Sequence, residues 1–121
     1  MKKVSLLFAC ALYCGCSVDT TQLAGTWQAV AFYENGASVQ TPLQEVNLTF
    51  SQDGGYAFNS IGYYREAGHF RSSMKYLYLS DTTVRPPKDR MLKVTYLSAD
   101  TLKLEMKKDD RLQALFMTRQ R

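Results

Sequence analysis

The chain contains no cysteine beyond residue 16. Its three cysteines, at positions 10, 14 and 16, all lie within the first 16 of its 121 residues. The rest of the chain therefore has no disulfide to form, even in an oxidising compartment. A domain built from it must be stabilised by a packed core.

Basic residues are missing from the first half of this remainder. Residues 17–64 contain four acidic residues and no Lys or Arg, whereas residues 65–121 contain 13 basic and seven acidic residues. The basic residues are interleaved with acids and alternate with apolar residues, a pattern typical of a solvated face. We therefore expect no nucleic-acid partner.

Side chains for catalysis or metal binding are also scarce. His69 is the only histidine, and a zinc or redox-metal site usually needs several His or Cys ligands. The sequence has no Gly-x-Ser-x-Gly motif for a nucleophilic serine. The acids Glu105, Asp109 and Asp110 fall in turns or at outward strand positions, not in an apolar pocket suited to proton transfer. We expect no enzymatic activity, no metal and no cofactor.

No apolar run is long enough to cross a bilayer, which takes roughly 20 helical residues. The segment Val4–Tyr13 is apolar except for Ser5, and it follows Lys2 and Lys3. A short positive segment followed by such a run is typical of a secretory signal peptide. Removal of residues 1–15 leaves 106 residues, enough for one domain, and lowers the net charge from +4 to +2 because two lysines are lost.

The cysteine at position 16 is the candidate lipid anchor. The segment Tyr13–Cys16 resembles the lipobox of bacterial lipoproteins, in which a small residue precedes a cysteine that is lipidated and becomes the new first residue. This resemblance implies a signal peptide over residues 1–15 and attachment to a membrane through Cys16. Cys10 and Cys14 remain alternatives, as does an ordinary signal peptide whose cysteines have no role. Residues 16–22 would form a polar tether.

From Thr26 onward the chain alternates between short apolar runs and clusters of Gly, Asn, Asp and Ser, and no window of a dozen residues has an apolar face at helical spacing. This pattern predicts an all-β domain. The predicted strands cover residues 25–33, 45–51, 55–60, 67–71, 76–80, 91–97, 101–107 and 112–120.

The connections support a meander of these strands. Asn35 and Gly36 form a tight turn, and Gly62 marks a bulge at a barrel corner. Residues 81–90 form a long loop, because Pro86 and Pro87 cannot donate ladder hydrogen bonds. Eight strands with short connections predict an antiparallel up-and-down β-barrel. Its interior would be just filled by side chains or able to hold one small ligand.

The first predicted strand contains Gly25-Thr26-Trp27, which resembles the Gly-x-Trp motif of the calycins, the group that includes the lipocalins. Over residues 23–119 the chain looks more closely like the lipocalin-like domains of small Bacteroides-group lipoproteins. The features of this resemblance are Leu23 before the motif, the Asp53-Gly54 turn, the Gly68-His69-Phe70 hairpin, Leu77 with Leu79, and Arg119 in the last strand.

The resemblance implies structural roles and a location. Trp27 would close the barrel floor next to Gly25, and Arg119 would lie across its indole, a contact worth on the order of 0.5–2 kcal/mol. Alternatively, Arg119 is a solvated strand end. The resemblance also implies the envelope of a Gram-negative bacterium. Because Ser17 and not Asp follows Cys16, we expect the outer membrane, facing either the periplasm or the exterior.

Aromatic residues crowd the middle of the chain and suggest two functions. In the first, a lipid-anchored protein binds a small hydrophobic or amphipathic ligand, with candidate lining residues Tyr56, Phe58, Phe70 and Tyr96. In the second, a filled barrel binds a protein partner through outward aromatic and basic side chains. An ordinary barrel core explains the aromatics as well. A void of roughly 300 Å³ or more would favour the ligand.

Overall fold

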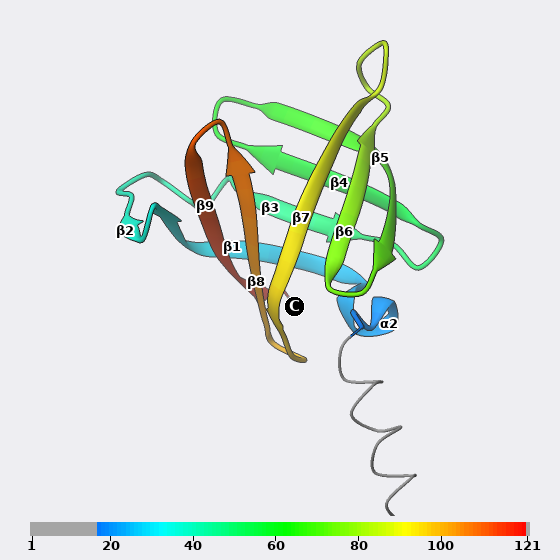
Figure 1. Cartoon of the computed structure of the whole chain (residues 1–121), viewed down its shortest axis with the longest axis horizontal. Coiled ribbons are helices and arrows are strands. Elements are labelled where there is room, and N and C mark those ends of the chain that lie inside the picture. Colours follow the sequence, from blue (N-terminus) through cyan, green and yellow to red (C-terminus); the bar gives the residue numbers. More distant parts are fainter. Residues whose placement is uncertain (1–16, 121) are drawn as a thin grey trace, which may run out of the picture.

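Nine antiparallel strands form one sheet that closes on itself (Figure 1). The structure, a computed structural model, describes residues 17–120. Its strands are β1 (Gly25–Glu34), β2 (Ala37–Ser38), β3 (Asn47–Phe50), β4 (Gly55–Ser60), β5 (Tyr64–Ser73), β6 (Tyr76–Asp81), β7 (Lys88–Leu97), β8 (Thr101–Lys108) and β9 (Arg111–Arg119). From β3 to β9, each strand pairs with the next one in the chain.

The barrel closes where β9 pairs with β1. The register runs from Trp27 opposite Arg119 to Glu34 opposite Gln113, with an irregularity between Ala29 and Ala31. Strand β1 also pairs with β3, which completes a ring of eight strands. The two-residue β2 folds back on the end of β1 outside this ring. The predicted eight-stranded antiparallel up-and-down barrel is therefore confirmed.

Alternation along each strand selects the side chains that enter the barrel. In β6, Leu77 and Leu79 are buried while Tyr76 and Tyr78 are only half-buried. The buried apolar residues form one continuous core: Leu23, Trp27, Ala29, Val46, Leu48, Phe50, Tyr56, Leu77, Leu79, Leu92, Val94, Leu102, Leu104 and Met117.

The two ends of the barrel differ, and we call them the floor and the mouth. The floor holds the helix α2 (Thr20–Leu23) and the turns that follow β3, β5 and β7. The mouth holds the turns that follow β4 and β8 and the loop that follows β6, which projects at the top of Figure 1. Because consecutive strands are antiparallel, their connections alternate between these ends.

A short helix forms part of the floor. Asp19 caps α2 by accepting hydrogen bonds from the backbone N–H groups of Thr21 and Gln22, at 3.0 and 3.3 Å. Leu23 at its end is fully buried, and its carbonyl accepts a 2.8 Å hydrogen bond from the indole of Trp27. Residues 20–22, predicted to belong to a tether, are instead docked on the barrel, because Leu23 must enter the core.

Several strand boundaries also differ from the predictions. Strand β7 begins at Lys88, so the connection from β6 is shorter than the predicted loop over 81–90. Gly62 lies in the turn between β4 and β5, with φ values of 78° at Gly62 and 63° at Tyr63, and not in a bulge. As a result β5 is ten residues long and begins at Tyr64. Tight turns with positive φ favour Gly and so explain the placement of Gly62.

Within residues 17–120, no helix is long and apolar enough to span a membrane. The proposed signal peptide, Cys16 and the alternatives Cys10 and Cys14 lie outside the described residues.

Candidate functional site

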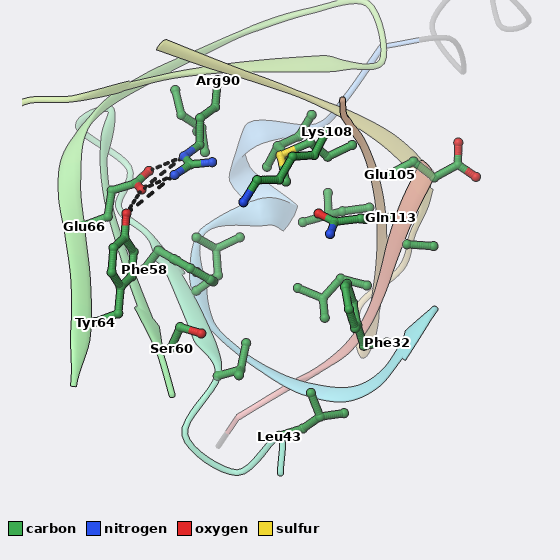
Figure 2. Close-up of a pocket in the computed structure, with 18 of the residues that line it drawn as sticks. Phe32, Leu43, Phe58, Ser60, Tyr64, Glu66, Arg90, Glu105, Lys108 and Gln113 are labelled. Atoms are coloured by element: carbon green, nitrogen blue, oxygen red, sulfur yellow. Dashed lines mark hydrogen bonds and ion pairs between the residues drawn. The ribbon is translucent and has the colours of Figure 1, made fainter. Parts of the chain in front are cut away.

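A cavity of about 580 Å³ occupies the barrel between the core and the mouth (Figure 2). This volume lies in the range of about 300–1,000 Å³ that is usual for small-molecule sites. The residues that line it come from nearly all the strands and from the 41–46 and 61 connections: Phe32, Thr41, Leu43, Val46, Leu48, Phe58, Ser60, Ile61, Tyr64, Glu66, Leu79, Lys88, Arg90, Leu92, Leu104, Glu105, Met106, Lys108, Gln113, Ala114 and Leu115.

Its walls are mainly apolar. Leu48, Leu79, Leu92 and Leu104 are buried core residues whose inner surfaces face the cavity. Phe58 is packed against the same core, and Figure 2 shows its ring directed into the space. An apolar ligand could therefore exclude water from these side chains, which is the main source of free energy for such binding.

A buried carboxylate forms the polar part of the wall. Glu66 in β5 is 2% exposed and lies beside Arg90 in β7. Arg90 Nε donates to both carboxylate oxygens, at 3.1 and 3.0 Å, and its Nη2 lies 3.0 Å from Oε1. A charged group this deeply buried must be paired, and the guanidinium supplies the pairing.

Two tyrosines complete the environment of this carboxylate. The hydroxyl of Tyr56 donates to Glu66 Oε2 and that of Tyr64 donates to Oε1, each at 2.8 Å. Tyr56 is buried, whereas Tyr64 is 45% exposed at the mouth. We call Tyr56, Tyr64, Glu66 and Arg90 the Glu66 cluster. It is a closed network in which each carboxylate oxygen has several donors.

The pKa shifts within this cluster all favour the same protonation states. Burial and the hydrogen bond to Glu66 raise the pKa of Tyr56 far above its usual range. The hydrogen bond to Glu66, with a smaller effect of burial, also raises the pKa of Tyr64. Burial disfavours the charge of Arg90, but the hydrogen bonds and charge of Glu66 outweigh it and raise the pKa of Arg90. Both tyrosines therefore remain donors and Arg90 remains a cation.

Comparison with known proteins places this barrel in a fold group. No family model matches the chain, and no curated protein matches its sequence. Among solved structures, a lipocalin-like protein from Bacteroides uniformis matches with a TM-score of 0.60 and 19% identity, over 78% of this chain and 96% of that chain. The chain has a lipocalin-like fold. The resemblance predicted from the sequence is confirmed at the level of the fold.

The floor of this lipocalin-like barrel contains the residues to which the resemblance gave structural roles. Arg119 Cζ lies 4.3 Å from the centre of the Trp27 ring. Its Nε and Nη1 donate to the carbonyls of Ala99 and Ala24, both at 2.7 Å, and Nη2 donates to that of Gln22. Gly25 has a φ of 129°, and a Cβ there would lie 2.5 Å from Arg119 Nη1. Glycine at this position therefore makes room for the arginine.

The four predicted lining residues occupy different environments. Phe58 lines the cavity. Tyr56 lies behind the wall, in the core, where it binds Glu66. Phe70 packs edge-on against Phe50, with ring centres 4.9 Å apart, and does not line this cavity. Tyr96 is 51% exposed on the outer face, beside the ammonium of Lys103.

Sequence reasoning missed Glu66, Arg90 and Lys108. Strand parity contained a signal for each of them. Arg90 lies two residues before the buried Leu92, and Lys108 lies four residues after the buried Leu104. Glu66 likewise shares the face of Phe70 in β5, four residues away. Extending the apolar alternation toward the mouth would have placed all three side chains on the inner face.

Other chemistry has little support in the described part of the chain. No group of three or more His, Cys, Asp or Glu side chains within residues 17–120 is arranged to hold a metal ion. His69 is exposed in β5. The distinctive chemical feature of the site is therefore its combination of an apolar interior and cations near the mouth.

Proposed function

We propose that this protein binds a small hydrophobic or amphipathic molecule inside its barrel and has no catalytic role. The observation that supports this proposal is the cavity of about 580 Å³ with its apolar walls. The alternative hypothesis, a barrel that acts only through its outer surface, assumed a filled interior. A cavity of this size favours the ligand over that alternative.

We further propose that the protein is a lipoprotein of the bacterial outer membrane, anchored through Cys16. The described chain begins next to the floor, where the N–H of Val18 donates to the carbonyl of Met74 at 2.9 Å, in the turn between β5 and β6. The mouth lies at the opposite end of the barrel (Figure 1). A lipid on Cys16 would therefore leave the mouth directed away from the membrane, accessible to a ligand in solution.

Binding of an uncharged fluorescent probe tests the ligand proposal. N-phenyl-1-naphthylamine fluoresces weakly in water and strongly in apolar sites, and we expect saturable binding to the purified protein. Ser60 lines the cavity, and Figure 2 shows its hydroxyl directed inward. A Ser60→Trp substitution should fill part of the space and weaken binding by at least about tenfold, as expected for loss of a few buried contacts.

Ser73→Trp provides the matched control, because Ser73 is exposed at the floor end of β5, away from the cavity mouth. It should leave probe binding unchanged. Circular dichroism would establish that both variants are folded. If Ser60→Trp and wild type bind the probe equally, or if wild type does not bind it, the cavity is not a ligand site. If the probe binds as expected, native mass spectrometry of the purified protein would search for a natural ligand that co-purifies.

A further inference from the structure

The charges around the cavity are unbalanced. Five ionisable residues line it together with Tyr64: the cations Lys88, Arg90 and Lys108 and the acids Glu66 and Glu105. Glu66 is bound by Arg90. Figure 2 shows the carboxylate of Glu105 directed away from the cavity. Two lysines therefore remain without an acidic counterpart inside the space.

Neighbouring acids on the inner face are already engaged. Glu34 accepts a hydrogen bond from Gln113 at 3.3 Å and lies 3.5 Å from the guanidinium of Arg111. Asp81 accepts hydrogen bonds from the backbone and hydroxyl of Thr83, at 2.9 and 2.5 Å. Neither acid forms an ion pair with Lys88 or Lys108 in the described part of the chain.

Arg90 has donor capacity beyond its pairing with Glu66. Its Nε and Nη2 bind the carboxylate, while Nη1 has no hydrogen-bond partner among residues 17–120. In Figure 2 this third nitrogen is turned away from Glu66 and toward the cavity. The carboxylate itself, surrounded by two tyrosines and Arg90, is already saturated with donors. The cluster therefore offers donors to the cavity and has no free acceptor for a cation.

Lys108 extends into the same space. Its strand, β8, is the neighbour of β7, so Lys108 and Arg90 belong to one wall. Figure 2 shows the Lys108 ammonium inside the cavity, and Lys108 has no ion pair within residues 17–120. Two cations on neighbouring strands repel each other unless an anion lies between them. A negatively charged group at this position would relieve the repulsion and bind both donors.

We propose that the ligand has a single anionic head group on an apolar chain. The head group would lie between Arg90 Nη1 and Lys108 Nζ, and the chain would pack against Leu48, Phe58 and Leu79. This inference depends on the proposed ligand-binding function and adds the chemical class of the ligand. A carboxylate, sulfate or phosphate ester would satisfy the same donors.

Competition between chemically matched compounds tests the inference. Decanoate, decanol and decyltrimethylammonium share an apolar chain and differ in the charge of the head group. Each would displace N-phenyl-1-naphthylamine from the cavity, and we expect decanoate to bind about tenfold more tightly than decanol, with decyltrimethylammonium the weakest. Decyl sulfate and decyl phosphate would then show which anion binds best. Equal affinities for decanoate and decanol would overturn the inference while leaving the proposed function intact.

Substitution of Lys108 locates the head group. Lys108→Gln should weaken decanoate binding by about three- to tenfold and leave decanol binding unchanged, because only the anion uses the ammonium. Lys107→Gln is the matched control: it removes the same charge from the adjacent residue, which is exposed as Lys108 is but does not line the cavity. If both substitutions weaken decanoate binding equally, the effect comes from overall charge and the proposed position is wrong.

A second variant tests the role of Arg90 without removing its charge. Arg90→Lys retains a cation for Glu66 but lacks the third guanidinium nitrogen that faces the cavity. We expect weaker binding of decanoate with unchanged binding of decanol, which also establishes that the cavity has been preserved. If decanoate binding is unaffected by both Arg90→Lys and Lys108→Gln, the anion does not bind at this wall.

Discussion

At the floor of the barrel, Arg119 stacks on Trp27 and donates hydrogen bonds to three backbone carbonyls. At the mouth, Arg90 binds the carboxylate of Glu66. Each arginine joins segments that are distant in the chain, but their partners differ. Arg119 binds uncharged backbone carbonyls at the floor, whereas Arg90 binds a buried, charged carboxylate at the mouth.

This difference separates a structural region from the region in which we propose that the ligand binds. Carbonyls left by a missing Arg119 could bind water at a partly exposed site, whereas the buried carboxylate of Glu66 would be left without its cation. The floor therefore tolerates loss of a cation better than the mouth does. The mouth retains this costly arrangement beside a cavity, which is consistent with a role in binding.

The largest effect is expected from Arg90→Met. This change leaves the Glu66 carboxylate buried without a cation, and we expect unfolding to become easier by about 3 kcal/mol, near the lower end for broken buried pairs because Arg90 is partly exposed. Urea unfolding would measure the loss. Arg71→Met is the control, since Arg71 is exposed, lies 4.3 Å from the centre of the Tyr78 ring and forms no ion pair within residues 17–120. Equal losses in the two variants would contradict the importance assigned to the buried pair.

Arg119→Met makes the same change at the floor, and we expect it to lower the free energy of unfolding by about 2 kcal/mol. The loss combines the stacking on Trp27 with hydrogen bonds that water can partly replace. The emission spectrum of Trp27, the only tryptophan, should change as well because its cationic neighbour is removed. Arg65→Met, at an exposed position in β5, should alter neither property. A loss larger than that of Arg90→Met would reverse the comparison between floor and mouth.

The floor could be predicted from the sequence because its residues belong to local signals. Gly25 and Trp27 stand two residues apart at the start of the first strand, and Arg119 lies in the last predicted strand. Closure of a barrel brings the first and last strands together, and the resemblance to lipocalin-like domains implied that Arg119 lies across the indole of Trp27. The helix α2 was missed because four residues are too few to show a helical period.

The mouth could not be predicted in the same way. Pro86 and Pro87 suggested a loop through residue 90, which concealed that β7 begins at Lys88 and that Arg90 faces inward. The pairing of Glu66 with Arg90 spans 24 residues and depends on the relative register of three strands. Aromatic residues were also assigned to the cavity by type, and only their positions in the folded sheet distinguish Phe58 from Tyr96.

Substitution of the two tyrosines of the Glu66 cluster tests how the burial of a donor changes what its hydrogen bond to the carboxylate contributes to stability. Tyr56→Phe removes a buried donor and should cost about 1.5–2 kcal/mol, as for hydrogen bonds to charged groups. Tyr64→Phe should cost about 0.5–1 kcal/mol, because water can reach its exposed position and replace the hydroxyl. Thermal and urea unfolding would measure both. Tyr63→Phe, in the adjacent exposed turn, is the control and should leave stability unchanged. A larger loss of stability from Tyr64→Phe than from Tyr56→Phe would show that exposure does not determine which hydrogen bond contributes more.

The smallest effect concerns Asp81, which is also on the inner face near the mouth. Hydrogen bonds from Thr83, its hydroxyl above all, hold the pKa of Asp81 below the ordinary value of 3.8. Because the folded-state pKa is lowered, the resulting stabilisation is present above pH 3.8 and is lost as the pH falls through the folded-state pKa. The melting temperature should therefore fall less steeply below this pH in Thr83→Val than in wild type.

Carboxyl NMR titration would follow Asp81 directly and link the melting curves to one residue. Thr83→Val should raise the pKa of Asp81 toward 3.8 by removing the hydroxyl donor while the backbone N–H donor remains. Thr82→Val is the matched control, because the Thr82 hydroxyl donates to the carbonyl of Ala67 and not to Asp81. An unchanged Asp81 pKa in Thr83→Val would mean that another donor holds this carboxylate in its ionised form. The backbone N–H groups of Thr83 and Ala67 would then account for the lowered pKa.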